Sequence, residues 1–224
     1  MLRSVATDLW VTERSQRFYG IEMGTRMSVV RLADGGIFVH SPVRLDATTR
    51  LDLDALGPLR AVVAPNKYHH LYVGDYVAAY PAAQIYAAPG LPEKRRDLTF
   101  HGVLSDDPPP LWAGQIDQIV FRALPAINDV VFCHRASRTL IVTDLVFNMQ
   151  RAASFSSWLL FRLDSAYQRF GPSRLWRLLT RDRTAARAAI DRILSWDFDR
   201  VIMAHGDVLE TGGHAAIGAA FDWL

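Results

Sequence analysis

Short apolar runs separated by turn residues characterise the first half of the chain. Asp34-Gly35 stands between two of these runs and favours a hairpin of two strands. The helical spacing of His70–Tyr80 falls between two other runs, and a strand, helix and strand in this order predict a right-handed crossover in a largely parallel sheet. The four runs expected to form strands are Met27–Leu32, Gly36–His40, Arg60–Ala64 and Gln84–Ala88.

The second half of the chain begins with strands and then becomes helical. A polar, proline-rich stretch at 95–110 is predicted to be a loop. The strands expected after it are Ile116–Leu124, Asp129–His134, Thr139–Leu145 and Arg200–Ala204. The helices expected from Ser154 onward are Ser154–Phe170, Ser173–Leu179, a segment with Ala186, Ile190 and Ile193 on one face, and Ala215–Trp223. Strands in two groups, each followed by helices, predict a layered α/β or α+β fold with its helices outside.

Length and composition indicate an ordinary globular protein. The 224 residues are half hydrophobic and 21% charged, contain no repeat or linker, and are expected to form one domain over 1–224. The net charge of +2 is too small to indicate a nucleic-acid partner. Cys133, the only cysteine, excludes an intramolecular disulfide and a thiolate metal cluster. We therefore expect a cytoplasmic protein, and no apolar stretch has the length of a transmembrane helix.

Histidine and aspartate follow three of the predicted strands. His69 and His70 come just after one strand, Asp144 near the end of another, and His205 directly after the last. Functional groups in α/β sheets gather beyond the carboxyl ends of strands. Imidazole and carboxylate together suit zinc, iron or manganese. Each residue alone is more often structural, as a hydrogen-bonded histidine or a turn aspartate, but together they predict a metal site or polar active site.

Segments around these residues resemble signatures of a known superfamily. Val62–Gly74, Leu140–Phe147 and Val201–Gly206 resemble, in order, three motifs of the metallo-β-lactamase superfamily. Met27–Leu32 and Gly36–Pro42 resemble the opening strands of a bacterial branch of it, known as a domain of unknown function, DUF4336. The resemblance spans nearly the whole chain. It implies a four-layer αββα sandwich with a metal site at one edge of its two sheets.

The resemblance also implies that part of the usual ligand set is lost. The superfamily places a His-x-His-x-Asp-His run after the strand that here ends at Pro65. If His70 takes the last histidine position, His69 stands in the aspartate's place, and Pro65 and Lys67 replace the two earlier histidines. A further histidine, expected near Pro125, is missing. The ligands implied for one remaining divalent metal, zinc first with iron or manganese as alternatives, are His69, His70, Asp144 and His205.

This set predicts a metal-dependent, hydrolase-like protein that acts on a small-molecule substrate. A metal there would lower the pKa of a water molecule, and Asp144 would serve as a ligand or as the catalytic general base. Four protein ligands, however, leave no open position and would favour a structural metal or a five-coordinate centre. The alternative is a degenerate, non-catalytic member of the same fold that binds a ligand or a partner.

Three further residues have candidate roles near this site. Lys67 would neutralise an anionic substrate, unless it is simply solvated. Tyr68 would donate a hydrogen bond to substrate, although packing under a helix is the alternative. Asp129 would orient a ligand or substitute for one, whereas an aspartate at a strand start is commonly a turn residue.

The helical segment at 154–182 combines tryptophan, leucine and arginine. Its place after Asp144 suggests a cap over the site, and the same composition suits a homodimer contact. Basic amphipathic helices also lie on anionic membranes. We rank the cap and the dimer above membrane contact.

Overall fold

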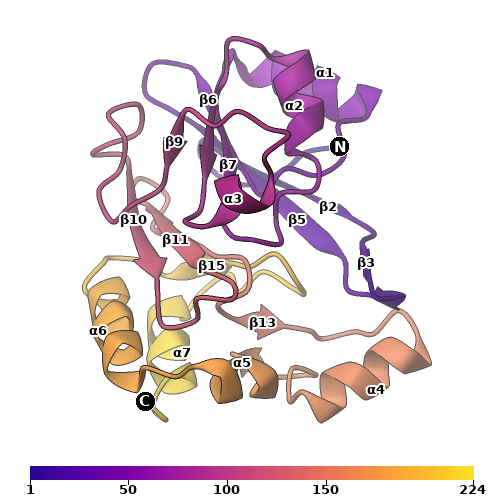
Figure 1. The fold of residues 1–224 in the computed structure, drawn as a ribbon, viewed down its shortest axis with the longest axis vertical. Helices are drawn as coiled ribbons and strands as arrows, with labels where there is room; N and C mark the ends of the chain where they lie inside the picture. Colours follow the sequence, from indigo (N-terminus) through magenta and orange to yellow (C-terminus); the bar gives the residue numbers. More distant parts are fainter.

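Two β-sheets face each other, and helices cover the outer side of each (Figure 1). The structure is a computed structural model that describes residues 1–224. The larger sheet has the strand order β1 (Arg3–Ala6), β2 (Leu9–Arg14), β5 (Thr25–Arg31), β6 (Ile37–His40), β7 (Leu59–Ala64), β8 (Gln84–Ala87) and β9 (Gly102–Val103). The smaller sheet has the order β10 (Ile116–Phe121), β11 (Asp129–His134), β12 (Thr139–Ile141) and β15 (Arg200–Ile202).

Seven helices and two short antiparallel strand pairs complete the fold. The pairs are β3 (Arg17–Phe18) with β4 (Ile21–Glu22), and β13 (Phe147–Asn148) with β14 (Phe170–Gly171). The helices are α1 (Ala47–Leu56), α2 (Val73–Ala79), α3 (Leu91–Lys94), α4 (Phe155–Leu163), α5 (Arg174–Leu179), α6 (Arg183–Leu194) and α7 (Gly213–Ala220). None of these helices combines the length and the apolar character needed to cross a membrane.

Strands of the larger sheet are apolar on both faces because both faces are covered. In β7, Ala61 and Val63 point into the cluster between the two sheets. Val62 and Ala64 point the other way, into a cluster that α1 and α2 close with Leu53 and other residues. Because successive side chains of a strand point to opposite faces, β7 contacts both the smaller sheet and the helices outside the larger sheet.

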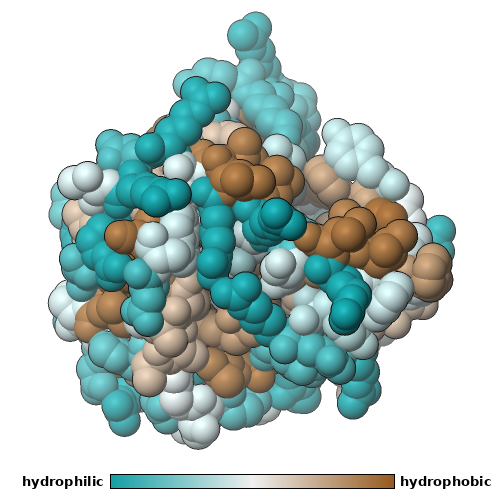
Figure 2. All heavy atoms as spheres, turned by 90° about the horizontal axis from the view of Figure 1, so that it is seen from below, coloured by the Kyte–Doolittle hydropathy of each residue, from teal (hydrophilic) through white to brown (hydrophobic).

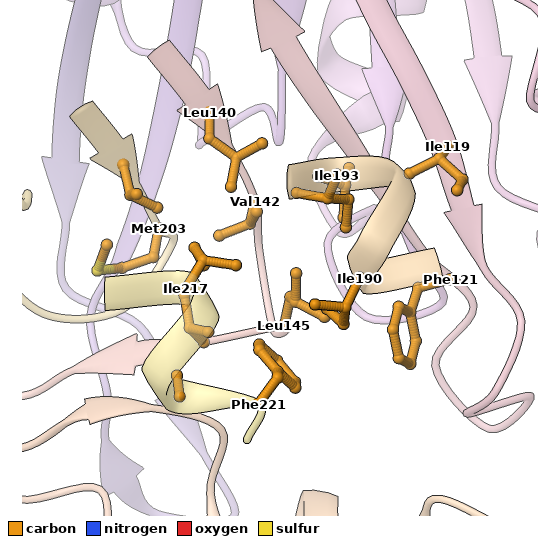
Figure 3. Close-up of a cluster of buried hydrophobic side chains, with 14 of the residues drawn as sticks. Ile119, Phe121, Leu140, Val142, Leu145, Ile190, Ile193, Met203, Ile217 and Phe221 are labelled. Atoms are coloured by element: carbon orange, nitrogen blue, oxygen red, sulfur yellow. The ribbon is translucent and has the colours of Figure 1, made fainter. Parts of the chain in front are cut away.

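The smaller sheet repeats this arrangement with the helices α6 and α7. Val130 and Phe132 of β11 face the larger sheet, while Val131 and Cys133 face the helices. Figure 3 shows Ile190 and Ile193 of α6 and Ile217 of α7 packed against this outer face. The four-layer αββα sandwich is thus confirmed.

The structure confirms the predicted parallel stretch and corrects several boundaries. β6, β7 and β8 are parallel, and β5 pairs with β6 through the predicted hairpin. The sequence analysis missed β1 and β2, and placed a loop where β9 forms a short parallel edge. The predicted helix Ser154–Phe170 was wrong beyond Leu163, because Ser165 and Gln168 adopt positive φ and Phe170 enters β14.

Candidate metal centre

Three side chains from separate loops meet at one edge of the two sheets. His69 follows β7, Asp144 follows β12, and His205 follows β15. Each offers one ligand atom, and these atoms lie within 4.8 Å of one another. The Asp144 carboxylate lies between the imidazoles, with Oδ2 3.5 Å from His69 Nε2 and Oδ1 3.3 Å from His205 Nε2. The three form a largely buried set of two nitrogen donors and one carboxylate.

Each imidazole is held through its other ring nitrogen. Nδ1 of His205 lies 2.9 Å from the Gly24 carbonyl oxygen, which only accepts, so this nitrogen carries a proton. Nδ1 of His69 lies 2.8 Å from Ser41 Oγ. Phe147 stacks on the His205 ring, with centroids 5.7 Å apart. Such contacts fix the orientation of each ring, with Nε2 directed at the Asp144 carboxylate.

The loop that carries His205 is fixed by an arginine and a glycine. Buried Arg26 donates through Nη1 to Met203 O and through Nη2 to Gly206 O. Gly206 has φ +87°, and a Cβ there would lie 2.2 Å from Asn148 O. The loop that positions His205 therefore requires glycine at this position.

Asn66 connects the loop after β7 to the loop after β12. This side chain is fully buried, and its Oδ1 accepts hydrogen bonds from the backbone N–H groups of Tyr68 and His69, both at 2.8 Å. Its Nδ2 donates to Asp144 Oδ2 at 2.6 Å and to Thr143 Oγ1 at 3.0 Å. Asn66 was not among the candidate residues predicted from the sequence, and its place between a strand end and two histidines was the one available signal.

Asp129 accepts hydrogen bonds from the turn that carries Asp144. Its Oδ2 accepts the backbone N–H groups of Asp144 and Leu145, both at 3.0 Å. Its Oδ1 accepts from Asn66 Nδ2 and from the Thr143 hydroxyl. Asp129 is not among the three converging ligand residues, and its role in orienting a ligand or substituting for one stays a prediction.

The two neighbouring carboxyl groups differ in charge. Burial and the nearby Asp144 carboxylate raise the pKa of Asp129 to about 7. Burial also acts to raise the pKa of Asp144, but the charges of His69 and His205 and their hydrogen bonds outweigh it and hold that pKa well below its usual range. The low pKa of Asp144 keeps its carboxyl group ionised, as a metal ligand must be.

The structure does not bring His70, Lys67 or Tyr68 into the cluster. His70 is buried on the other side of the turn, where Arg95 Nη1 lies 3.0 Å from its Nδ1, and burial with the charges of Lys94 and Arg95 lowers its pKa to about 4. Consecutive residues in a turn point in different directions, which separates the rings of His70 and its neighbour. The ammonium group of Lys67 donates to a backbone carbonyl 2.8 Å away, and Tyr68 is 42% exposed.

His40 is a buried residue that the sequence analysis assigned only to its strand. Neither of its ring nitrogens has a hydrogen-bond partner, and the ring packs edge-on against Phe132 with centroids 5.3 Å apart. Burial, together with nearby His69, lowers the pKa of His40 to about 3. His40 is thus a neutral imidazole in the apolar layer directly behind the site.

Replacing His40 by phenylalanine is expected to reduce the loss of stability on acidification. With its folded pKa of about 3 below the unfolded value, His40 binds a proton more readily in the unfolded chain. The free energy of unfolding therefore falls as pH drops below about 6.5, by roughly 1.5 kcal/mol from this group between pH 6.5 and pH 5. Urea unfolding of metal-free protein at both pH values measures the difference. An equal pH dependence in the wild type and the variant would contradict this assignment.

Comparisons with known proteins agree with the fold. The model of a family described as "Domain of unknown function (DUF4336)" matches residues 6–157. No curated protein matches the chain.

Solved metallo-β-lactamase structures superpose on nearly the whole chain. The enzyme from Pontibacter korlensis shares 12% identity at a TM-score of 0.66, covering 99% of this chain and 98% of its own. DIM-1 metallo-β-lactamase exposed to ceftazidime shares 15% identity at a TM-score of 0.67, and the superposition covers 100% of this chain and 96% of that one. FIM-1 from Pseudomonas aeruginosa, in a mono-zinc form, shares 11% identity at a TM-score of 0.65, and the superposition covers 100% of this chain and 95% of that one. At such identities the likeness shows the fold alone, which is that of the metallo-β-lactamases.

Proposed function

The chain belongs to the DUF4336 family, and from this premise we propose that it is a hydrolase that uses one divalent metal held by His69, Asp144 and His205. The observation that carries the proposal is the convergence of three ligand atoms within 4.8 Å, with His70 turned away from them. Three protein ligands leave a fourth position open, as catalytic zinc sites require. The four-ligand set expected from sequence would have closed that position.

The residues present fit such an ion. The 3.3 Å separation between Asp144 Oδ1 and His205 Nε2 resembles the edge of a tetrahedron whose bonds are ~2.0–2.1 Å long. Both histidines have their outer nitrogen engaged, which is the usual arrangement for metal-ligating histidine. Zinc is our first choice because it accepts this nitrogen and oxygen set, and iron and manganese accept it as well. The mono-zinc form of FIM-1 supports a one-metal site on this fold.

A divalent ion bound by this set would supply the Lewis acidity that polarises a scissile bond and acidifies water. The chain itself supplies orientation and proton transfer. Asn66 and the backbone contacts of Asp129 fix the Asp144 carboxylate. Asp144 would hold the ion through one carboxylate oxygen, and its other oxygen would be the acceptor for a proton from water. Phe147 covers the His205 ring and keeps bulk water from that side.

A cavity beside the His205 loop is our choice for the substrate site. Its volume is about 370 Å³, which is within the range of small-molecule pockets. Gly24, Ala204 and Gly206 line it on the side of the ligand residues, and Met149 and Phe161 line it on the side of α4. Phe161 of α4 is the only residue of 154–182 that lines this cavity, which supports a partial cap by α4 and none by α5.

Metal analysis and a substrate screen test the proposal. Protein purified without added metal should contain close to one ion per chain, which a chelator removes. Hydrolysis of an ester, thioester, lactone or phosphodiester should then depend on the ion and be lost in His205→Ala. A metal content near zero that zinc, iron and manganese all fail to restore would contradict the proposal.

The second candidate is a non-catalytic protein that binds a ligand or partner in the same cleft. It is motivated by Pro65 and Lys67, which stand where the resemblance implies two histidines. Stoichiometric metal without hydrolysis of any screened substrate would favour this candidate. Hydrolysis abolished by His205→Ala would exclude it.

A further inference from the structure

Helices α4 and α5 expose large apolar side chains to solvent. The most exposed are Phe155 at 74%, Leu163 at 65%, Leu175 at 57% and Leu178 at 74%. Leu159, Leu160 and Leu179 are each at least 40% exposed as well. Figure 2, which views the molecule from the side of these helices, shows brown apolar groups separated by teal polar side chains. Half of the exposed large apolar residues of the whole chain therefore lie within 155–179.

The arginines of the same region have no acidic partners. All seven arginines of 151–183 lack an ion pair, whereas the only other arginines without one are Arg44 and Arg96. They are Arg151, Arg162, Arg169, Arg174, Arg177, Arg181 and Arg183. Of the 16 arginines outside this region, fourteen form an ion pair with a carboxylate.

The two acidic residues of this region accept hydrogen bonds from the backbone at the starts of helices. Asp164 Oδ1 accepts the backbone N–H of Leu175 at 2.7 Å, at the start of α5. Asp182 Oδ1 accepts the backbone N–H of Ala185 at 2.8 Å, at the start of α6. Neither carboxylate pairs with an arginine, so the surface keeps a strong positive charge around its apolar side chains.

We propose that the surface formed by α4, α5 and the seven arginines of 151–183 docks onto an anionic lipid bilayer. Apolar side chains that enter the headgroup region, flanked by arginines that meet anionic lipids, are the features of helices that lie on membranes. A two-fold dimer would set the surface against itself and bring unpaired arginines of one copy against those of the other. A cap accounts for Phe161, which lines the cavity, but not for these leucines, which point to solvent. Their exposure reverses the ranking made from sequence.

Vesicle sedimentation tests this docking with the full chain. The protein is expected to bind vesicles of phosphatidylcholine with about 30% phosphatidylglycerol at least tenfold more tightly than vesicles of phosphatidylcholine alone. Binding should weaken at high salt, because the Debye length falls to about 3 Å at 1 M. Leu163→Glu and Leu178→Glu should each lower the affinity about tenfold. Both side chains are exposed, so neither substitution disturbs the core.

Leu51 on α1 provides a matched control, because it is 70% exposed and lies outside this surface. Leu51→Glu should leave vesicle binding unchanged. The proposal is overturned if the wild type does not bind the anionic vesicles at low salt, or if Leu51→Glu weakens binding as much as Leu178→Glu. It is also overturned if sedimentation shows a dimer that Leu178→Glu dissociates, since the surface would then join two copies of the chain. None of these outcomes depends on the proposed hydrolysis.

Discussion

Replacing Asp144 by asparagine is expected to lower zinc affinity by about 10²- to 10³-fold, or roughly 3–4 kcal/mol. The amide keeps the shape of the side chain but removes the only negative charge of the ligand set. Its NH₂ group would also face one of the two Nε2 atoms, which lie 3.3 and 3.5 Å from the carboxylate oxygens. Competition with a chromophoric chelator measures the affinity, with circular dichroism to confirm folding.

His70→Gln is the matched control for this experiment. The ring of His70 is engaged with Arg95 and lies outside the converging group, so zinc affinity should change by less than about threefold. If His70→Gln weakened zinc binding as much as Asp144→Asn, His70 would be a ligand after all. The four-ligand set expected from sequence would then replace the three-ligand site.

Replacing Asn66 by alanine is expected to lower the free energy of unfolding by about 3–5 kcal/mol. The substitution removes five hydrogen bonds made by one fully buried amide. It leaves the buried carboxylates of Asp129 and Asp144 with fewer donors, and two backbone N–H groups with no acceptor. Urea unfolding of the chelator-treated protein at pH 7 measures the effect without a contribution from bound metal.

Asn148→Ala serves as the comparison, since Asn148 is also buried but its side chain makes only two hydrogen bonds, one donated to Asp207 O at 2.9 Å and one accepted from Gln150 Nε2 at 2.6 Å. Its expected cost is about 1 kcal/mol. Equal losses from the two substitutions would show that Asn66 does not act as a connecting residue. A smaller loss for Asn66→Ala would rule out the network as a source of stability.

These predictions rest on contacts that sequence patterns do not contain. The predicted strands between 27 and 145 correspond to strands of the structure because their apolar runs are local and fit a sheet covered on both faces. β1 and β2 were missed because their polar side chains interrupt the pattern. The extent of α4 was overestimated because leucine and arginine favour a helix whether or not the chain turns, and positive φ at Ser165 ends this one.

The candidate site also has features that the sequence predicted and features that it did not. The three converging residues were expected from their positions after strands, since the carboxyl ends of parallel strands lie at one edge. The separation of His70 from these three residues was not expected, because the direction of each ring depends on the turn at 66–70. Asn66, Ser41 and Gly24 reach the site across 78, 28 and 181 positions of the chain, and only folding brings those loops together.

The sequence by itself determined the central strands of both sheets, their apolar character and the strand ends at which histidine and aspartate would appear. It did so because hydrophobic periodicity and turn residues act over a few neighbouring positions. Only the tertiary structure decided which side chains share the site, which histidine turns away, and which leucines face solvent. Those outcomes depend on packing between segments distant in the chain and on the burial that this packing creates.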